Sequence, residues 1–373
     1  MKLSFFTIAL ILSFSGCIKE EEQENYSCDF EDNDITYYNY TTNENISFDN
    51  EPYGYSQWAL HYNKDFYEEN NIDKNAHIDG DEVYKNYTGS GIKVAIIDDG
   101  FDTIHYELDG RVVETINYTD DSLYGGVSHT TDDDFHGTAV AGIIGANSNN
   151  KGIRGVAPNS QLILIKMKEA STDSETIDMF RKAVEAGADI INCSWGTYDV
   201  SESVRDYINC ITTNARDKKG LIVVFASGND NQDMGNDESS ISGVIAVGAT
   251  NKYNQRSWYS NYGKDLDIVA PGGSDKYYGL GISTLDPMGY DGLMGNEYNG
   301  YDNYDKFIGT SASAPIVSGA LALTLEKYPD ITREELQNLL KITSDKIGDE
   351  EYNTYGRNDK YGYGKLNLNK LIY

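Results

Sequence analysis

Residues 309–323, GTSASAPIVSGALAL, set small hydroxyl and methyl side chains directly before an apolar run with helical spacing. A Ser or Thr before a helix, with Pro315 in the first turn, is favourable capping chemistry. The same arrangement suits a serine nucleophile at a helix start, because the small neighbours of Ser311 let a substrate backbone approach closely. The segment alone leaves both interpretations open, and the rest of the chain has to separate them.

The chain around this segment alternates between apolar runs and helical patterns. The runs with the length of buried strands are residues 93–97, 161–167, 189–195, 221–226, 244–249 and 266–270. Residues 174–188, SETIDMFRKAVEAGA, have helical spacing between two of them. Strands that are apolar throughout and alternate with helices predict an α/β fold, with a doubly wound, mostly parallel sheet covered on both faces. Functional groups in such sheets gather at the carboxyl ends of the strands.

Polar residues stand at several of these strand and helix ends. Asp98 follows the run 93–97, His136 precedes a helix of small and apolar residues, and Asn229 follows the run 221–226. Each has an ordinary structural interpretation, namely a strand-terminating turn, a helix-entry histidine and a loop asparagine. Together with Ser311 they match the parts of a hydrolytic triad and its oxyanion donor.

The chemistry requires these residue types. Ser311 would attack a carbonyl, and His136 would take the serine proton and return it to the leaving amine. Asp98 would fix the imidazole tautomer and stabilise the imidazolium. Asn229 and the Ser311 main-chain N–H would donate to the developing oxyanion.

Four blocks in this order resemble the signatures of subtilisin-like serine proteases. They are VAIIDDG (94–100), HGTAVAGIIGA (136–146), ASGN (226–229) and GTSASAP (309–315). The chain order Asp, His, Ser is also that of subtilisin. The resemblance runs from about residue 57 to 368. It implies a single subtilisin-like peptidase domain over 53–373, with Asp98, His136 and Ser311 as the triad and Asn229 as the oxyanion residue.

Smaller features resemble the kexin/furin branch of this family. DDG (98–100), NCSWG (192–196) and SASAP (311–315) carry that resemblance, whereas Thr197 departs from the usual Pro. The branch lines its pockets with acids that pair with substrate Arg or Lys. The implied substrate-binding residues are Asp99 and Asp133 for the second residue before the cut, Asp199 for the first, and Ser194, Trp195 and Gly196 alongside.

We therefore predict cleavage after paired basic residues. The alternative is that so acidic a chain places aspartates at these positions by chance. A further acid is expected in the loop after Asn229, where Asp233, Asp237 and Glu238 are available.

The loop ANSNNKGIRGVAP (146–158) resembles the family's tight calcium site. The resemblance implies a structural Ca²⁺ held by the Asn149 side chain, the Lys151 and Ile153 carbonyls and the Glu107 carboxylate. Oxygen ligands on a surface loop suit Ca²⁺. The alternative is a solvated Asn-rich loop, and no organic cofactor is expected.

Charge narrows the classes of partner. The chain of 373 residues has 60 acidic and 30 basic side chains, a formal net charge of -30. Nucleic acid is an improbable partner because phosphate binding needs a basic face. Proteins or peptides, basic ones in particular, and metal cations fit this charge better. We expect a monomer.

The N-terminal sequence is typical of a targeting segment. Residues 1–16 combine a short basic start with an apolar run too short to span a membrane comfortably. Cys17 then stands where a bacterial lipobox places its lipid-modified cysteine, although Phe14 replaces the usual aliphatic residue. A plain secretory signal is the alternative. Residues 17–52 are acidic and predict a flexible tether.

We therefore expect an exported, membrane-anchored lipoprotein on a periplasmic or cell-surface face. If Cys17 carries lipid, Cys28, Cys193 and Cys210 can form at most one disulfide within the chain, and their spacing matches no zinc pattern.

Three functions compete. An active serine endopeptidase is favoured because no triad member is missing. A catalytically silent, calcium-binding surface lipoprotein that binds peptides is the alternative. A lipase-like hydrolase would need a G-x-S-x-G elbow, whereas Ser311 lies in T-S-A-S.

Overall fold

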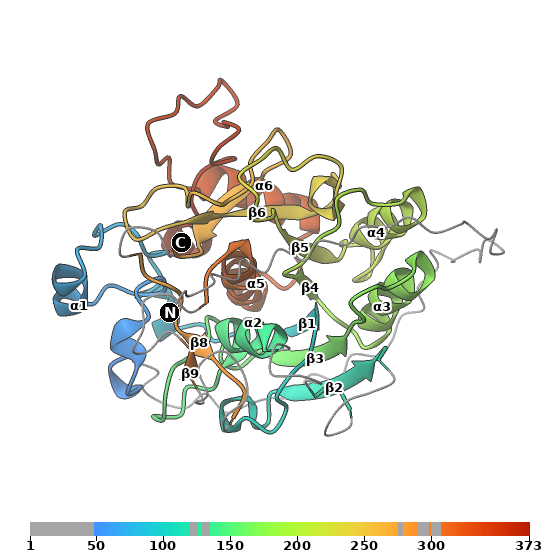
Figure 1. Cartoon of the computed structure of the whole chain (residues 1–373), viewed down its shortest axis with the longest axis horizontal. Coiled ribbons are helices and arrows are strands. Elements are labelled where there is room, and N and C mark those ends of the chain that lie inside the picture. Colours follow the sequence, from blue (N-terminus) through green and yellow to red (C-terminus); the bar gives the residue numbers. More distant parts are fainter. Residues whose placement is uncertain (1–47, 120–125, 129–134, 275–278, 289–297, 300–306) are drawn as a thin grey trace, which may run out of the picture.

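The computed structural model describes residues 48–119, 126–128, 135–274, 279–288, 298–299 and 307–373, and the statements below concern these residues. Their central feature is a seven-stranded sheet in the order β2-β3-β1-β4-β5-β6-β7, in which every neighbouring pair is parallel (Figure 1). The strands are β1 (Lys93–Asp98), β2 (Val112–Asn117), β3 (Gln161–Lys166), β4 (Ile190–Cys193), β5 (Ile222–Ala226), β6 (Ile245–Thr250) and β7 (Ile268–Pro271). The predicted fold class is confirmed.

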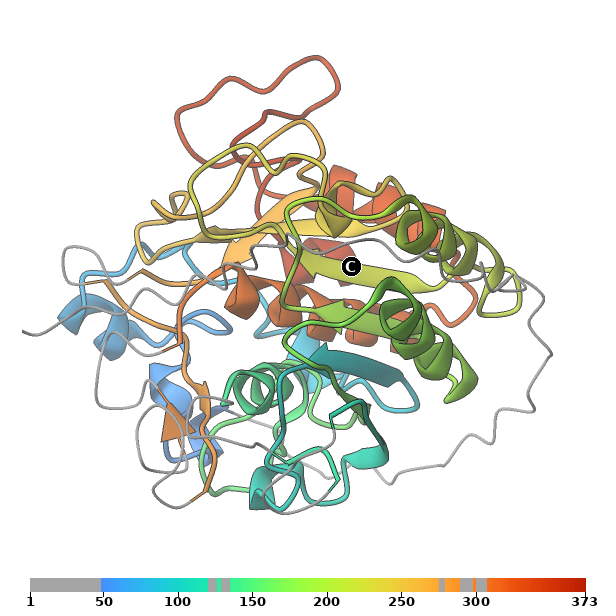
Figure 2. The same cartoon turned by 45° about the vertical axis from the view of Figure 1, so that its right-hand side comes forward.

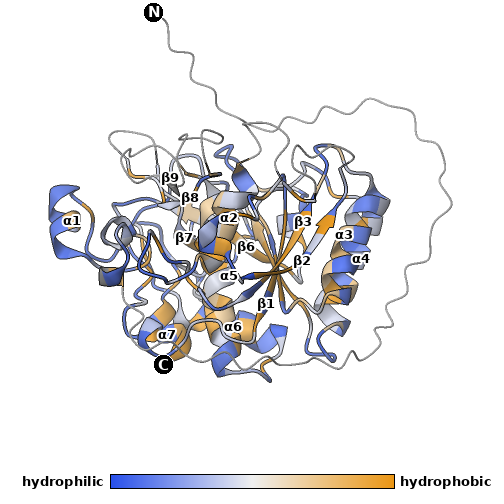
Figure 3. Cartoon of the chain, turned by 90° about the horizontal axis from the view of Figure 1, so that it is seen from below, coloured by the Kyte–Doolittle hydropathy of each residue, from blue (hydrophilic) through white to orange (hydrophobic). Residues whose placement is uncertain are grey.

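Alternate residues of the inner strands enter two different cores. Val94 and Ile96 of β1 pack with helices α2 (His136–Gly145) and α5 (Thr310–Lys327). Ala95 and Ile97 pack on the opposite face with α3 (Asp173–Glu185) and α4 (Glu202–Asn214). Figure 2 shows the helices on the two sides of the sheet, and Figure 3 shows the apolar strands between them. Burial on both faces explains why these strands have apolar runs in place of alternation.

Strand β2 was not predicted, and its place explains why. It is an edge strand that pairs only with β3, and most of its side chains are exposed or half-buried. Its sequence VVETIN therefore lacks a continuous apolar run.

Helix α5 answers the capping question raised by residues 309–323. The N-cap residue is Gly309, which makes no side-chain cap bond and has φ of 129°, in the region that favours glycine. Ser311 is the second residue of the helix. From Thr310 to Leu325 the helix is buried, which explains its small and apolar composition. The N-cap interpretation of the serine and threonine side chains is therefore wrong.

Smaller elements complete the described chain. The helices are α1 (Lys64–Glu69), α6 (Arg333–Thr343) and α7 (Leu368–Ile372), and strands β8 (Thr284–Leu285) and β9 (Tyr298–Asn299) form an antiparallel pair. Single 3₁₀ turns lie at Phe48–Asn50, Gly54–Ser56, Val83–Lys85, Tyr106–Leu108 and Glu238–Ser240. No helix in the described part of the chain combines the length and the apolar character needed to cross a membrane.

The N-terminal predictions lie largely outside the described residues. Residues 1–16, Cys17 and Cys28 are among those not described. The described chain begins at Phe48, which is buried against the domain, so the last residues of the predicted tether already belong to the folded part. Cys193 is buried and free, and Cys210 on α4 is disulfide-bonded.

Candidate active site

The four predicted catalytic residues stand at the ends of central elements. Asp98 ends β1, His136 begins α2, Ser311 lies in the first turn of α5, and Asn229 follows β5. The strand order changes direction at β1, which has β3 on one side and β4 on the other. The carboxyl ends of strands around such a switch point form the usual binding crevice of open α/β sheets.

Asp98 and His136 form a close pair. His136 Nδ1 lies 2.7 Å from Asp98 Oδ1, which also accepts a hydrogen bond from the Asp99 N–H at 2.9 Å. The carboxylate is buried, and its second oxygen has no hydrogen-bond partner among the described residues. The Phe307 ring packs against the imidazole, with centroids 5.4 Å apart. These contacts fix the ring orientation that a general base needs.

The pair also determines the protonation of the imidazole. Burial is the largest single influence and lowers the pKa of His136. The charge of Asp98 and its hydrogen bond raise this pKa, Asp99 raises it further, and the balance is a pKa of about 9. His136 is therefore mainly protonated at neutral pH.

Ser311 is nine-tenths buried and bonded to the neighbouring strand end. Its hydroxyl donates to the Ser194 carbonyl at 3.0 Å, and the Ser194 hydroxyl donates back to the Ser311 carbonyl at 3.1 Å. Proton transfer to His136 thus requires the Ser311 hydroxyl to leave the Ser194 carbonyl. Catalytic hydrogen bonds of this kind often form only once substrate is bound.

The Asn229 amide is locked in one orientation. Its Oδ1 accepts from the Thr310 N–H at 2.9 Å and from the Thr310 hydroxyl at 3.0 Å. A main-chain N–H can only donate, so the atom facing it must be the oxygen, and Nδ2 is the atom left to donate elsewhere. The Thr310 hydroxyl also accepts from the Gly228 N–H at 3.2 Å. Asn229 is exposed, so Nδ2 can serve as an oxyanion donor.

The predicted acid Asp99 has a structural partner. Its Oδ1 accepts from the Gly137 N–H at 2.8 Å, at the N-terminus of α2, where a carboxylate is stabilised by the helix dipole. It remains half-buried beside His136. Asp133, its predicted companion in the pocket for the second residue, lies outside the described residues.

The predicted acid of the pocket for the first residue, Asp199, lies at the surface. It is exposed, and its Oδ1 accepts from Asn236 Nδ2 at 2.6 Å. Two buried acids lie nearer the predicted substrate-binding residues Ser194, Trp195 and Gly196. These are Asp237 and Glu238, which sequence reasoning named only as unaligned alternatives. The Trp195 indole is turned toward the sheet and donates to the Ile97 carbonyl at 2.9 Å.

Two of the predicted metal ligands, Glu107 and Asn149, are in direct contact. Glu107 is fully buried, and its Oε2 accepts from Asn149 Nδ2 at 2.9 Å. The Asn149 Oδ1 atom is buried with no hydrogen-bond partner among the described residues. The main-chain carbonyls of Lys151 and Ile153, which follow Asn149 on the same loop, accept no main-chain hydrogen bond from the described residues. An orphaned amide oxygen, two free carbonyls and a buried carboxylate fit a hard cation such as Ca²⁺.

Sequence reasoning missed Glu51, which holds this loop. Its Oε1 accepts from the Ser148 hydroxyl at 3.0 Å and the Asn150 N–H at 3.2 Å, and its Oε2 accepts from the Lys151 N–H at 3.0 Å. The neighbouring Gln57 donates to the Arg154 carbonyl at 2.7 Å. No local signal marks Glu51, because its partners are about a hundred residues away.

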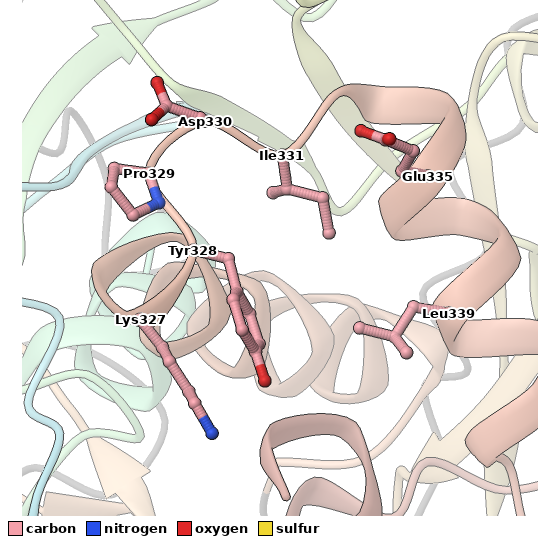
Figure 4. Close-up of a pocket in the computed structure, with 7 residues that line it drawn as sticks. All are labelled: Lys327, Tyr328, Pro329, Asp330, Ile331, Glu335 and Leu339. Atoms are coloured by element: carbon pink, nitrogen blue, oxygen red, sulfur yellow. The ribbon is translucent and has the colours of Figure 1, made fainter.

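A separate hollow lies at the far end of α5, between that helix and α6 (Figure 4). It is lined by Lys327, Tyr328, Pro329, Asp330, Ile331, Glu335 and Leu339. None of the predicted site residues is among them.

Most of this chain is similar to known proteins. Residues 89–364 match the model of the subtilase family, Peptidase_S8. The chain is 32% identical over 326 residues to the calcium-dependent protease of Trichormus variabilis, covering 80% of this chain and 48% of that protein. It is 31% identical over 289 residues to subtilisin DY of Bacillus licheniformis, covering 76% of this chain and 91% of that protein.

Solved structures agree on the fold. A serine protease of Aeromonas sobria, in complex with its chaperone, superposes with a TM-score of 0.71 at 22% identity, covering 81% of this chain and 62% of that one. A protease of Pseudoalteromonas arctica gives 0.69 at 24% identity, covering 87% and 98%. The chain spans about half the length of the calcium-dependent proteases that it matches. It belongs to the subtilase family of serine proteases.

Proposed function

We propose that this protein is a serine endopeptidase. The observation that carries the proposal is the contact between the half-buried His136 and the buried Asp98, whose Nδ1 and Oδ1 atoms lie 2.7 Å apart, with Ser311 in the first turn of α5. A peptide-binding protein without catalysis would not need an imidazole held by a buried carboxylate. The membership of the chain in the subtilase family supports the same reading.

The mechanism follows from the roles of these atoms. His136 Nε2 takes the proton from the Ser311 hydroxyl as Oγ bonds to the peptide carbonyl carbon. The carbonyl electron pair moves onto oxygen, which the Asn229 Nδ2–H and the Ser311 N–H stabilise. His136 then gives its proton to the leaving amine, and the C–N bond breaks. Water repeats the sequence on the acyl-enzyme with His136 as base, and Asp98 stabilises the imidazolium in both halves.

We further propose a structural Ca²⁺ on the loop 146–158. The Glu107 carboxylate, Asn149 Oδ1 and the carbonyls of Lys151 and Ile153 would hold it. Bound there, the ion would supply positive charge to the buried Glu107 and tie the loop to the domain. Two relatives named calcium-dependent proteases support the assignment.

The proposal extends to substrate and location. A net charge of -30 and the Asp99 carboxylate beside His136 support a preference for basic residues before the cut, with Asp99, Asp133 and Asp199 as the predicted pocket acids. The N-terminal 16 residues and Cys17 support export and a lipid anchor on a periplasmic or cell-surface membrane, with the peptidase as a monomer.

Hydrolysis of two chromogenic peptides tests the function. One peptide ends in Arg-Arg and the other in Ala-Phe, with calcium present and Ser311→Ala as the control. Cleavage by the wild type and none by the variant supports the proposal. If the folded, calcium-loaded wild type cuts neither peptide and the variant binds both equally well, the silent peptide-binding alternative replaces it.

A further inference from the structure

Cys210 forms a disulfide whose partner can be found by elimination. The sequence has four cysteines, namely Cys17, Cys28, Cys193 and Cys210. Cys193 is a free thiol, whereas Cys210 is disulfide-bonded. A disulfide within this chain therefore joins Cys210 to Cys17 or to Cys28. Both candidates precede Phe48, where the described chain begins, so the bond links the folded domain to the predicted N-terminal tether.

The two described cysteines have different surroundings. Cys193 ends β4 and is fully buried in the core that the sheet forms with α3 and α4. Burial raises the pKa of its thiol, and the charges of Glu238 and Asp98 raise it further, so little reactive thiolate forms there. Cys210 lies on α4, is 8% exposed, and is not among the described residues that form the hydrophobic cores. Cys210 is therefore the cysteine that a partner from outside the core can reach.

Cys210 also lies far from the proposed catalytic residues along the sheet. Helix α4 connects β4 to β5 as the crossover of two parallel strands (Figure 1). The Leu221 N–H, directly before β5, donates to the Ile211 carbonyl at 3.0 Å. Cys210, next to Ile211, is therefore near the amino-terminal edge of the sheet. Asp98 and Asn229 stand at the opposite, carboxyl-terminal edge.

We propose that Cys28 is the disulfide partner of Cys210, so that the predicted tether is fastened to α4. The choice of Cys28 over Cys17 rests on the proposed lipid anchor, because a cysteine whose sulfur carries lipid has no thiol to oxidise. The two remaining thiols each lose a proton, and together they give two electrons to a disulfide oxidant of the exported compartment. The sulfur–sulfur bond forms, and the oxidant is reduced to a dithiol.

The length of the chain permits this connection. An extended chain from residue 28 to residue 48 spans at most about 70 Å, whereas a domain of this size has a radius of gyration of about 20 Å. Phe48 belongs to the core on the side of the sheet that carries α2 and α5, and α4 packs on the other side. The intervening residues are thus long enough to pass around the edge of the domain.

The disulfide would shorten the effective tether between the lipid and the peptidase. Measured along an extended chain, Cys17 is at most about 110 Å from Phe48 but only about 40 Å from Cys28. Attachment at Cys210 would also place the anchor toward the amino-terminal edge of the sheet, with the catalytic residues at the opposite edge. The bond would therefore hold the domain close to the membrane with the proposed site turned away from the anchor.

Cleavage within the tether tests the pairing in the full-length chain. A thrombin recognition sequence replaces residues 35–40, and Ser311→Ala prevents self-digestion. After thrombin treatment, intact mass measured without reductant should show the two fragments still joined, and reductant should separate them. The Cys28→Ser variant should separate completely without reductant. Separation of the Cys28-containing chain without reductant, or joined fragments in Cys28→Ser, overturns the proposal.

Cys193→Ala is the matched control. It removes the free thiol, and its fragments should stay joined; if they separate, the bond uses Cys193 and the proposal fails. None of these measurements needs catalysis, so they are independent of the proposed peptidase function. Membrane fractionation tests the anchor separately, because an uncut chain in the soluble fraction contradicts the anchor without changing the masses. In an anchored chain, thrombin with reductant should release the peptidase, and release by thrombin alone also overturns the proposal.

Discussion

The protonation of His136 predicts an unusually alkaline activity profile. The imidazole must be neutral to accept the serine proton, and its pKa is about 9 in place of the ordinary 6.5. At pH 7.5, roughly 3% of such a group is neutral, against roughly 90% for an unperturbed histidine. kcat/KM should therefore rise about tenfold per pH unit up to about pH 8.5 and level off only above pH 9, since this constant reports the free enzyme.

Asp99→Asn provides the matched perturbation. Asp99 raises the pKa of His136 through its charge, and an Asn side-chain oxygen can still accept from the Gly137 N–H. The inflection of kcat/KM should move to lower pH in this variant, measured on a peptide without basic residues. Asp65→Asn, an exposed change in the first turn of α1, should leave it in place. An inflection of the wild type near pH 6.5, or no movement in Asp99→Asn, would refute the electrostatic reasoning.

The same pKa predicts how stability depends on pH. A group whose pKa is raised in the folded state stabilises that state below its unfolded pKa, and the stabilisation is lost as the pH rises through the folded value. For His136 the window runs from 6.5 to about 9, and the loss is at most about 3 kcal/mol. Urea unfolding of Ser311→Ala, which cannot digest itself, should show this loss. The double variant with His136→Ala should lose correspondingly less over the same window.

Three further variants test the packing around the site. Thr310→Val leaves the half-buried Gly228 N–H without its acceptor and should cost about 1 kcal/mol in urea unfolding, with kcat reduced more than KM is changed. Gly309→Ala places an alanine at a strained φ and brings its methyl group to 3.3 Å from Asn229 Nδ2. We expect kcat/KM on a chromogenic peptide to fall more than tenfold. An unchanged value would mean that Asn229 is not held as described. Glu51→Gln should weaken calcium affinity, measured calorimetrically, and reduce the drop in Tm that EDTA causes. The control Glu68→Gln changes an exposed glutamate and should do neither. Equal calcium affinity in the two variants would contradict the role given to Glu51.

The sequence predicts the inner sheet well because burial on both faces leaves a strong pattern. Strands β1 and β3 to β7 each carry a continuous apolar run, so their existence and parallel arrangement can be read directly. Strand β2 was not predicted, because an edge strand with exposed side chains has no continuous apolar run. The start of α5 is ambiguous in sequence, since small hydroxyl residues suit a cap and a nucleophile alike. Only the backbone assigns the cap to Gly309.

Site residues fixed by local blocks are easier to predict than those fixed by long-range pairing. Asp98 and His136 each stand at the end of one element, and the fold brings the two ends together. Asp199 was assigned only by resemblance to a family branch, and in the structure it is exposed and bonded to Asn236. Glu51 meets its loop across about a hundred residues, so no spacing rule could have marked it.

The placement of the nucleophile on α5 has a consequence for the making of the protein. This helix packs against β4, β5, β6 and β7 and is buried along most of its length, so it fills the core of one face of the sheet. A growing chain that stops short of Thr310 carries the Asp98 and His136 side chains but neither the serine nor the helix that holds the sheet face together. The proposed site is therefore completed only when α5 takes its buried place, so that assembling the nucleophile and closing this face of the sheet are one folding event.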